Sequence, residues 1–281
     1  MPDLPQAAAA FSYRGRLAPS PTGWLHIGHA RTFWTAYQRC LAARGRLVLR
    51  NEDLDASRAR PEYEQAMIED LRWLGIRWDE GPDCVGASGP YAQSQREHRH
   101  RLAFERLRRD GWVYPCRCTR KDIQAAVAAP HPGDEEAIYP GFCRGLRIEE
   151  IGDVAPAWRF RVPEAQAVSF VDGGFGPQSF VAGRDFGDFV VWRKDDHPAY
   201  QLAVVVDDAE MGITEVVRGA DLLLSTARQL LIYRALGLEP PAFYHCPLVL
   251  DDQGRRLAKR HDSLSIRTLR TAGRSPESIR G

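Results

Sequence analysis

Two histidines, His26 and His29, stand three residues apart around Gly28 in the stretch GRLAPSPTGWLHIGHART, residues 15–32. Side chains three residues apart on a helix lie on the same side of it. The first turn of a helix also presents unpaired backbone N–H groups and the positive end of the helix dipole, which together attract anions. The spacing therefore predicts imidazole donors for phosphate oxygens at a helix start. The alternative is a pair of partly exposed surface histidines.

The elements around this motif predict a fold that alternates strands and helices. A strand over residues 13–18 precedes the histidines, and apolar residues spaced three and four apart from Ile27 to Leu41 predict an amphipathic helix after them. A buried strand at Leu47–Arg50 follows, and then come helices that begin at Pro61 and span Gln95–Arg109. Strands and helices joined in this order favour an α/β domain with a parallel sheet.

The sequence becomes irregular from Tyr114, where cysteine, proline and glycine residues interrupt the alternation of predicted strands and helices. Alternating residues near 157–164 and 168–176 predict antiparallel strands. Beyond residue 189 we expect strands and turns, with Asp207 and Asp208 directly after an apolar strand at the edge of a site. Ser225 is expected to cap a helix that ends near Gly237. An insertion over residues 114–188 therefore interrupts the α/β domain.

Composition excludes several classes of protein. The 281 residues carry a formal net charge of +1, so a nucleic-acid partner must be bound by local basic patches. The sequence shows no apolar run of bilayer-spanning length, and residues 1–12 do not resemble a secretory signal. Six cysteines are too few for a disulfide framework. We expect a cytoplasmic protein without a membrane partner and a short mobile tail at 1–12.

Three cysteines, Cys116, Cys118 and Cys143, lie on the irregular segment and predict a metal site. Three thiolates suit tetrahedral Zn²⁺, whose role would be to order an insertion that has few apolar residues. Chemistry alone makes His131 the first candidate for a fourth ligand and Tyr139 the second, because phenolate is an uncommon ligand. The alternative is three reduced cysteines that bind no metal.

The motif around the histidines carries a family resemblance. RLAPSPTG at 16–23, followed by HIGH at 26–29, resembles the first ATP-binding signature of class I aminoacyl-tRNA synthetases, in the form of the glutamate-specific branch. RRLAKRHDS at 255–263 resembles the second signature, although Ala258 stands where that family has a serine. Taken alone, this second stretch would be interpreted as a solvated basic turn. The resemblance implies a Rossmann-type parallel sheet and ATP binding by His26, Gly28, His29 and Lys259.

The same resemblance implies a glutamate pocket. Arg16 resembles the arginine that fixes a substrate carboxylate, and Glu52 resembles the acid that receives the substrate ammonium. Tyr200 and Arg218 resemble the residues that close the pocket, and two arginines suit a substrate with two carboxylates. Glu52 could instead be a capping or salt-bridged acid, and Tyr200 could be a core residue. The implied contacts are completed by the stretch Leu17, Ala18, Pro19 and Ser20.

The cysteine pattern, C-x-C and then Y-x₃-C, is similar to the zinc site of the glutamyl-queuosine tRNA(Asp) synthetase family, whose ligands match Cys116, Cys118, Tyr139 and Cys143. The resemblance to that family covers nearly the whole chain. It implies two halves of a catalytic domain at 13–113 and 189–246, with a zinc-bearing α+β insertion at 114–188. Residues 247–281 would hold the second ATP signature and a C-terminal helix, without an anticodon-binding domain.

The function implied is ATP-dependent, tRNA-independent activation of L-glutamate to glutamyl-adenylate, followed by transfer to queuosine at the wobble position of tRNA(Asp). Such a ligase needs no nucleophilic side chain. We expect it to bind one structural Zn²⁺, to use Mg²⁺ with ATP, and to be a monomer. The alternatives are the catalytic part of a glutamyl-tRNA synthetase charging a tRNA 3′ end, a small-molecule nucleotidyltransferase, and a non-catalytic zinc-bearing RNA-binding protein. Basic candidates for RNA contact are Arg96, Arg99, Arg101, Arg106, Arg108 and Arg109.

Overall fold

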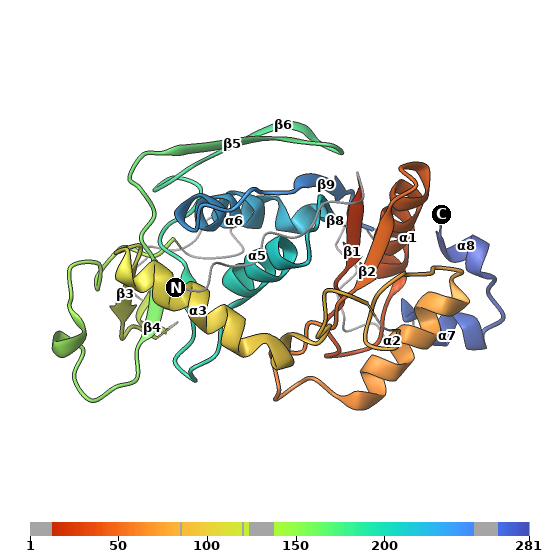
Figure 1. Ribbon diagram of the computed structural model, residues 1–281, viewed down its shortest axis with the longest axis horizontal. Coiled ribbons are helices and arrows are strands. Elements are labelled where there is room, and N and C mark those ends of the chain that lie inside the picture. Colours follow the sequence, from red (N-terminus) through yellow and green to blue (C-terminus); the bar gives the residue numbers. More distant parts are fainter. Residues whose placement is uncertain (1–12, 85, 120, 124–137, 250–263, 281) are drawn as a thin grey trace.

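A six-stranded sheet forms the centre of the computed structural model, which describes residues 13–84, 86–119, 121–123, 138–249 and 264–280 (Figure 1). The strand order is β2-β1-β8-β9-β5-β6. The first five strands in this order pair in parallel and β6 is antiparallel to β5, which confirms the predicted parallel α/β sheet. The strands are β1 (Arg14–Leu17), β2 (Arg46–Leu49), β5 (Ala167–Asp172), β6 (Gly176–Val181), β8 (Glu215–Gly219) and β9 (Ala242–Cys246).

Helices cover both faces of this sheet. Successive residues of a strand point to opposite faces, and in β8 Val217 packs in the core beside α1 (Ile27–Ala42), whereas Val216 packs in a second core. That second core contains residues of α5 (Tyr200–Glu210) and α6 (Leu223–Ala235). The sheet therefore has an apolar layer on each side, as expected of a buried parallel sheet.

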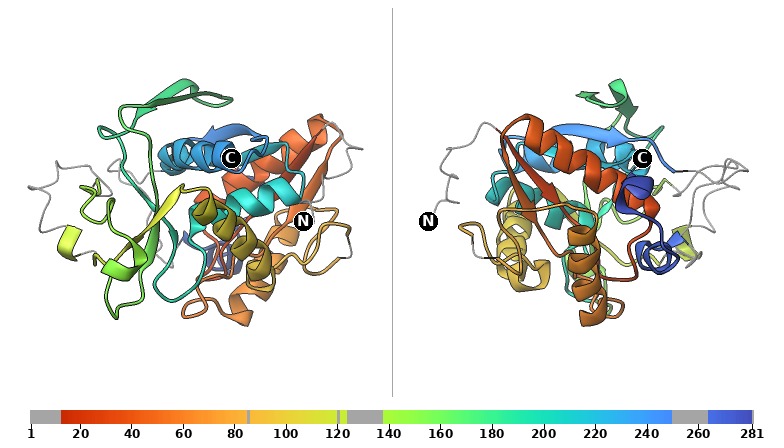
Figure 2. Two further views of the ribbon diagram at one scale, coloured as in Figure 1. Left: turned by 60° about the vertical axis from the view of Figure 1, so that its left-hand side comes forward. Right: turned by 90° about the vertical axis from the view of Figure 1, so that its right-hand side faces the viewer.

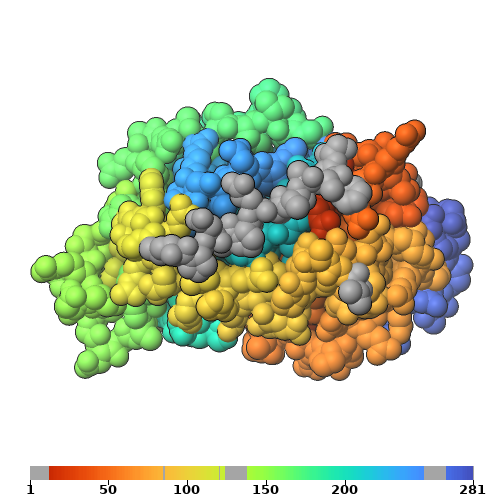
Figure 3. All heavy atoms as spheres, in the orientation of Figure 1, coloured from red at the N-terminus to blue at the C-terminus, as the bar shows by residue number. Residues whose placement is uncertain are grey.

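The remaining helices surround this centre. In the space-filling view, α2 (Pro61–Trp73), α3 (Glu97–Arg109) and the chain between them form a band along one face (Figure 3). The short helices α7 (Ile266–Thr271) and α8 (Pro276–Arg280) lie at the end of the molecule formed by α1 and α2 (Figure 2). Their guanidinium groups cover tryptophan rings in the pairs Arg267–Trp24, Arg270–Trp73 and Arg280–Trp34.

A second, three-stranded sheet is antiparallel and has the order β3-β4-β7. It consists of β3 (Val113–Cys116), β4 (Ala157–Phe160) and β7 (Val190–Trp192). Although β5 and β6 fall within residues 114–188, β5 pairs with β9 of the large sheet. Conversely, β7 lies beyond residue 188 and pairs with β4. The two sheets thus share the chain in an interleaved way. Short 3₁₀ turns complete the elements at η1 (Gln93–Arg96), η2 (Ile148–Glu150) and η3 (Ala220–Leu222).

Two sequence predictions for this half of the chain are wrong. Residues 200–210 form a helix and not a strand, so Asp207 and Asp208 lie on α5. Leu202–Asp208 are all buried, which removes the polar face that would have given a helical period, and the run of valines favoured a strand. Ser225 lies inside α6, whose N-cap is Leu222, because η3 already begins the turn. In the described part of the chain, no helix has the length and apolarity needed to cross a membrane.

Candidate active site and metal centre

The two histidines lie where α1 begins, as predicted. His26 is the N-cap residue, and its Nδ1 accepts a hydrogen bond from the Gly28 backbone N–H at 3.1 Å. The His29 Nδ1 accepts from the His26 backbone N–H at 3.2 Å, and the two rings stack with centroids 3.8 Å apart. Because each Nδ1 is an acceptor, each neutral ring carries its hydrogen on Nε2. Both imidazoles are therefore N–H donors at a helix N-terminus, which suits an anionic ligand.

Gly28 is required by this arrangement. A Cβ at position 28 would lie 2.9 Å from Cε1 of His26, closer than real Cβ contacts. Any larger residue would push the His26 ring away from the helix start. The glycine therefore serves the geometry of the histidine pair.

The residues predicted for the glutamate pocket come together at the carboxyl ends of neighbouring strands. Arg16 is on β1, Glu52 follows β2, Arg218 is on β8, and Tyr200 begins α5. Strands β2, β1 and β8 are adjacent in the sheet, and ligands of open α/β sheets bind at this edge. Tyr200 is 38 % exposed, which excludes its alternative role as a core residue.

Arg218 is a buried cation surrounded by neutral groups. Its Nη2 donates to the Thr226 hydroxyl at 2.7 Å, its Nη1 donates to the Gln229 carbonyl at 2.9 Å, and its Nε donates to Nε2 of His245 at 3.1 Å. Its Nη1 also lies 3.5 Å from the Tyr200 hydroxyl. Across the described ranges no carboxylate forms an ion pair with it. Burial lowers the pKa of Arg218, since a cation in such surroundings lacks the partner that would stabilise its charge.

Arg16 is the second buried guanidinium of this pocket. Its Nη1 donates to the backbone carbonyl of Val217 at 2.9 Å, and its Nε lies 3.7 Å from Asp208, too far for a hydrogen bond. The Nε atom has no hydrogen-bond partner among the described residues. Two buried arginines with incomplete anionic pairing thus lie near each other at this edge of the sheet, an arrangement that suits a negatively charged ligand.

Glu52 forms a buried salt bridge with Arg50. Its carboxylate accepts from Nη2 of the fully buried Arg50 at 3.0 Å, and Nη1 of Arg50 donates to Asp208 at 2.6 Å. The alternative expected for Glu52, a salt bridge, is therefore real. Burial raises the pKa of Glu52, and the charges of Arg50 and Arg16 oppose that rise. An incoming ammonium group would find a desolvated carboxylate, whose attraction for a cation is strong.

Asp207 anchors the same network beneath the pocket. It accepts from Arg96 at 2.6 Å, from Gln93 at 2.8 Å, and contacts Nε2 of His100 at 2.9 Å. Burial opposes ionisation of Asp207, but the His100 bond and the Arg50 charge outweigh it and lower its pKa to about 2. Arg96 is 1 % exposed, so its prediction as an RNA contact is wrong: it is a structural cation paired with acids of α5.

The stretch from Leu17 to Ser20 follows Arg16 and forms backbone hydrogen bonds with the segment that contains Glu52. The Leu17 side chain is buried in the core, and its carbonyl accepts from the Arg50 backbone N–H at 2.8 Å. The carbonyl of Pro19 accepts from the Glu52 backbone N–H at 3.0 Å. Ala18 is half-buried and Ser20 is exposed. This stretch therefore fixes Glu52 relative to Arg16, and its direct contacts with glutamate stay a prediction.

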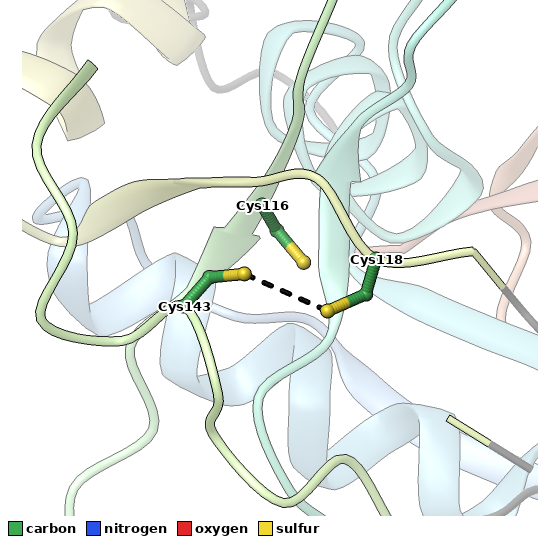
Figure 4. A group of neighbouring side chains, drawn as sticks. All are labelled: Cys116, Cys118 and Cys143. Atoms are coloured by element: carbon green, nitrogen blue, oxygen red, sulfur yellow. Dashed lines mark hydrogen bonds between the residues drawn. The ribbon is translucent and has the colours of Figure 1, made fainter. Parts of the chain in front are cut away.

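The three cysteines converge in the second site. The sulfur atoms of Cys116, Cys118 and Cys143 point toward one another and lie within 4.8 Å (Figure 4). The Tyr139 hydroxyl lies 3.4 Å from Sγ of Cys116 and 3.6 Å from Sγ of Cys118, and the Cys118 and Cys143 sulfurs are 3.5 Å apart. A tetrahedral Zn²⁺ requires separations of about 3.8 Å between sulfurs and about 3.6 Å between sulfur and oxygen, from its bond lengths. The Cys118–Cys143 separation and the two sulfur–oxygen separations are close to these values, so the four side chains could hold that ion.

A buried arginine accompanies this cluster. Nε of Arg159 donates to Sγ of Cys116 at 3.3 Å, and its guanidinium stacks on the Tyr139 ring 3.9 Å from the centroid. A cation beside thiolates would offset their charge. The Tyr139 hydroxyl thus lies beside the three sulfurs, and the choice between Tyr139 and His131 as the fourth ligand stays a prediction. His131 lies outside the described residues, as do Lys259, Ala258 and the tail at 1–12.

The family is established by the sequence as a whole. Residues 12–280 match the family model described as "tRNA synthetases class I (E and Q), catalytic domain". The chain therefore belongs to the class I tRNA synthetase family for glutamate and glutamine. A glutamate tRNA ligase from Elizabethkingia meningosepticum, solved with its amino acid, has a TM-score of 0.77 and 32 % identity, over 88 % of this chain and 52 % of that one.

Curated relatives narrow this assignment. The glutamyl-Q tRNA(Asp) synthetase of Nitratidesulfovibrio vulgaris is 52 % identical over 95 % of this chain and 84 % of its own length. That of Symbiobacterium thermophilum is 50 % identical over the same shares. A glutamate–tRNA ligase of Nitrosococcus oceani is 42 % identical, and the match covers 57 % of its length. Within its class, the chain belongs to the glutamyl-Q tRNA(Asp) synthetase family.

Sequence reasoning missed three residues that shape the pocket. Arg50, Asp172 and His245 are all buried at or near the ends of strands, yet none belongs to a motif. The position of Arg50 at the end of an apolar strand was a usable signal, because a charge there must have partners. No local signal links Asp172 to His245, whose contact depends on the pairing of β5 with β9.

Proposed function

We propose that this chain activates L-glutamate with ATP, without needing tRNA for that step, and transfers the glutamyl group to the queuosine base at the wobble position of tRNA(Asp). The names of its curated relatives in two bacteria support the proposal. The observation that carries it is the pair of buried arginines, Arg16 and Arg218, beside a desolvated carboxylate at Glu52. Such a pocket suits a ligand with both negative charge and an ammonium group.

The glutamate pocket would orient its substrate through contacts with the two carboxylates and the ammonium group. Arg218 and Arg16 would bind a substrate carboxylate through charge-assisted hydrogen bonds, and Glu52 would accept the ammonium. The Tyr200 hydroxyl, next to Arg218, would complete the carboxylate contacts. The second carboxylate then faces the start of α1. Its oxygen attacks the α-phosphorus of ATP, an O–P bond forms, and pyrophosphate leaves with the electrons of the broken P–O bond.

ATP would be bound at the start of α1. His26 and His29 each present an Nε2–H donor there, at the positive end of the α1 dipole, and Gly28 makes room for the His26 ring. Lys259 is proposed to follow the phosphates as charge develops on the leaving pyrophosphate, with Mg²⁺ arriving on ATP. In the second step a hydroxyl of the queuosine cyclopentenediol attacks the glutamyl carbonyl carbon, and AMP leaves. The chain's contribution is position and charge neutralisation.

Cys116, Cys118, Cys143 and Tyr139 are proposed to hold one Zn²⁺. The ion would supply no step of the reaction; it would order the segment that joins β3 to β4, where apolar residues are few. We further propose the domain limits 13–113, 114–188 and 189–246, with β5 and β6 of the middle segment completing the large sheet and β7 completing the small one. We also propose the second ATP signature within 247–281, a monomeric state and a cytoplasmic location.

The decisive experiment is an acceptor test. Purified chain, ATP and labelled glutamate are incubated with tRNA(Asp) that carries queuosine, and in parallel with the same tRNA lacking it. Labelling is expected only with queuosine. Equal labelling of both tRNAs would favour charging of a 3′ end, as in the glutamate–tRNA ligases that share this fold. Absence of glutamate-dependent ATP–pyrophosphate exchange would favour the alternative that the chain is a nucleotidyltransferase acting on another small molecule.

A further inference from the structure

Behind Arg218 lies a buried pair that no site motif contains. Asp172, the last residue of β5, and His245, on β9, are respectively 2 % and 0 % exposed. Oδ2 of Asp172 lies 2.6 Å from Nδ1 of His245, and Nε2 of His245 lies 3.1 Å from Nε of Arg218. The order carboxylate, imidazole, guanidinium runs across three adjacent strands, since β8 pairs with β9 and β9 with β5.

The hydrogen bonds fix the tautomer of His245. The Nε of Arg218 always carries a hydrogen, so Nε2 of His245 must accept it. Nδ1 of His245 therefore carries the imidazole hydrogen and donates it to Asp172. Oδ1 of the same carboxylate accepts backbone N–H groups from His245, Gly174 and Phe175. Burial, with the charge of Arg218, lowers the pKa of His245, in agreement with a neutral ring.

This arrangement orients Arg218 without neutralising its charge. A carboxylate bonded directly to Arg218 would orient the guanidinium but compete with a bound anion for it. With His245 between them, Asp172 fixes the orientation while every direct partner of Arg218 in the described structure is neutral. We infer that Asp172 and His245 are positioning residues, which hold Arg218 with its charge available to the substrate carboxylate. This inference rests on the proposed glutamate activation.

The isosteric variant Asp172→Asn tests it. The amide oxygen can keep the three backbone bonds, so the amide NH₂ replaces Oδ2 beside His245. It then donates to Nδ1 and forces the hydrogen of the ring onto Nε2, where it opposes the N–H of Arg218; an analogous exchange in the serine-protease triad produces the wrong tautomer. The KM for glutamate in ATP–pyrophosphate exchange is expected to rise at least roughly tenfold, with the KM for ATP changed less than about twofold.

A second variant distinguishes two roles of Asp172: orienting Arg218 through His245, and supporting the backbone turn at Gly174 and Phe175. His245→Gln offers Arg218 a neutral carbonyl acceptor and has no tautomer, so we expect its KM for glutamate to rise less than about threefold. In that background Asp172→Asn is expected to add less than about twofold, since the introduced amide then has no ring to reorient. Asp185→Asn is the matched control, because Asp185 also accepts a backbone N–H, from Val181 at 2.6 Å, but lies away from Arg218.

Imidazole ¹⁵N spectra provide a readout that does not depend on activity. His245, assigned by its loss in His245→Gln, is expected in the Nδ1–H form in the natural chain and in the Nε2–H form in Asp172→Asn. The inference is overturned if the natural chain shows the Nε2–H form. It is also overturned if Asp172→Asn raises the KM for glutamate equally in both backgrounds. A natural chain that shows the expected tautomer but no glutamate-dependent exchange would refute the proposed function instead.

Discussion

Replacing Glu52 by glutamine probes the ammonium contact with little change of shape. The amide oxygen of the introduced side chain can still accept from Arg50 at the present 3.0 Å, which turns the NH₂ group toward the pocket. The substrate ammonium then meets a donor where it had a charged acceptor. A hydrogen bond to a charged group contributes about 1.5–3 kcal/mol, so the KM for glutamate is expected to rise roughly 10- to 150-fold. The KM for ATP should be unchanged in the exchange assay.

The pH dependence of the same pair gives an independent measurement. Burial raises the pKa of Glu52, so in the natural chain the carboxylate takes up a proton at a higher pH than an exposed glutamate does. A protonated Glu52 cannot neutralise an ammonium, and the KM for glutamate should therefore increase as the pH falls through that raised pKa. Glu52→Gln should lack this increase. The reasoning is refuted if the variant keeps a KM within about twofold of the natural value, or keeps the same rise at acid pH.

Three further predictions concern the metal centre and the stability of the fold. Tyr139→Phe removes the oxygen donor and should weaken Zn²⁺ binding at least roughly tenfold in competition with a chromophoric chelator; unchanged binding would point to another fourth ligand. Asp207→Asn leaves buried cations unpaired and should lower the free energy of unfolding in urea by about 3–5 kcal/mol. Glu105→Gln, at a surface ion pair with both side chains about half exposed, should cost about 0–1 kcal/mol, and equal losses would contradict the argument. Because the pKa of Asp207 is lowered from 3.8 to about 2, its contribution is present above about pH 4 and lost as the pH falls toward 2. Arg280→Ala removes a guanidinium 4.2 Å from the Trp34 ring centroid and should cost about 1 kcal/mol without changing either KM.

The parts of the site that local geometry determines could be predicted from the sequence. The histidine pair and Gly28 depend on a single helix start, and the spacing of three residues already places both rings on one side. The strand that contains Arg16 and the strand that precedes Glu52 are recognisable by their apolar pattern, but the roles of these two residues came from the family resemblance. The family resemblance, rather than spacing, supplied Tyr200 and Arg218, because nothing in their own neighbourhood says that α5 and β8 meet.

The parts that depend on long-range pairing could not be predicted. The strand expected before Asp207 is a helix because tertiary burial removes the polar face by which a surface helix is recognised. The contact of Asp172 with His245 joins residues 73 positions apart and exists only because β5 crosses from the region of the small sheet to β9. A sequence pattern of period two describes each strand but does not say which strands are neighbours.

The burial of α5 has a consequence for the cost of binding glutamate. Tyr200 stands at its first turn and Asp208 about two turns later, with seven consecutive buried residues from Leu202 onward. Backbone amides enclosed in this way exchange with solvent only through opening of a large part of the domain. Tyr200 at the wall of the pocket and Asp208, whose carboxylate pairs with Arg50 and lies 3.7 Å from Arg16, are therefore parts of one rigid helix. Glutamate has little of this wall to order when it binds, and more of its interaction energy remains as affinity.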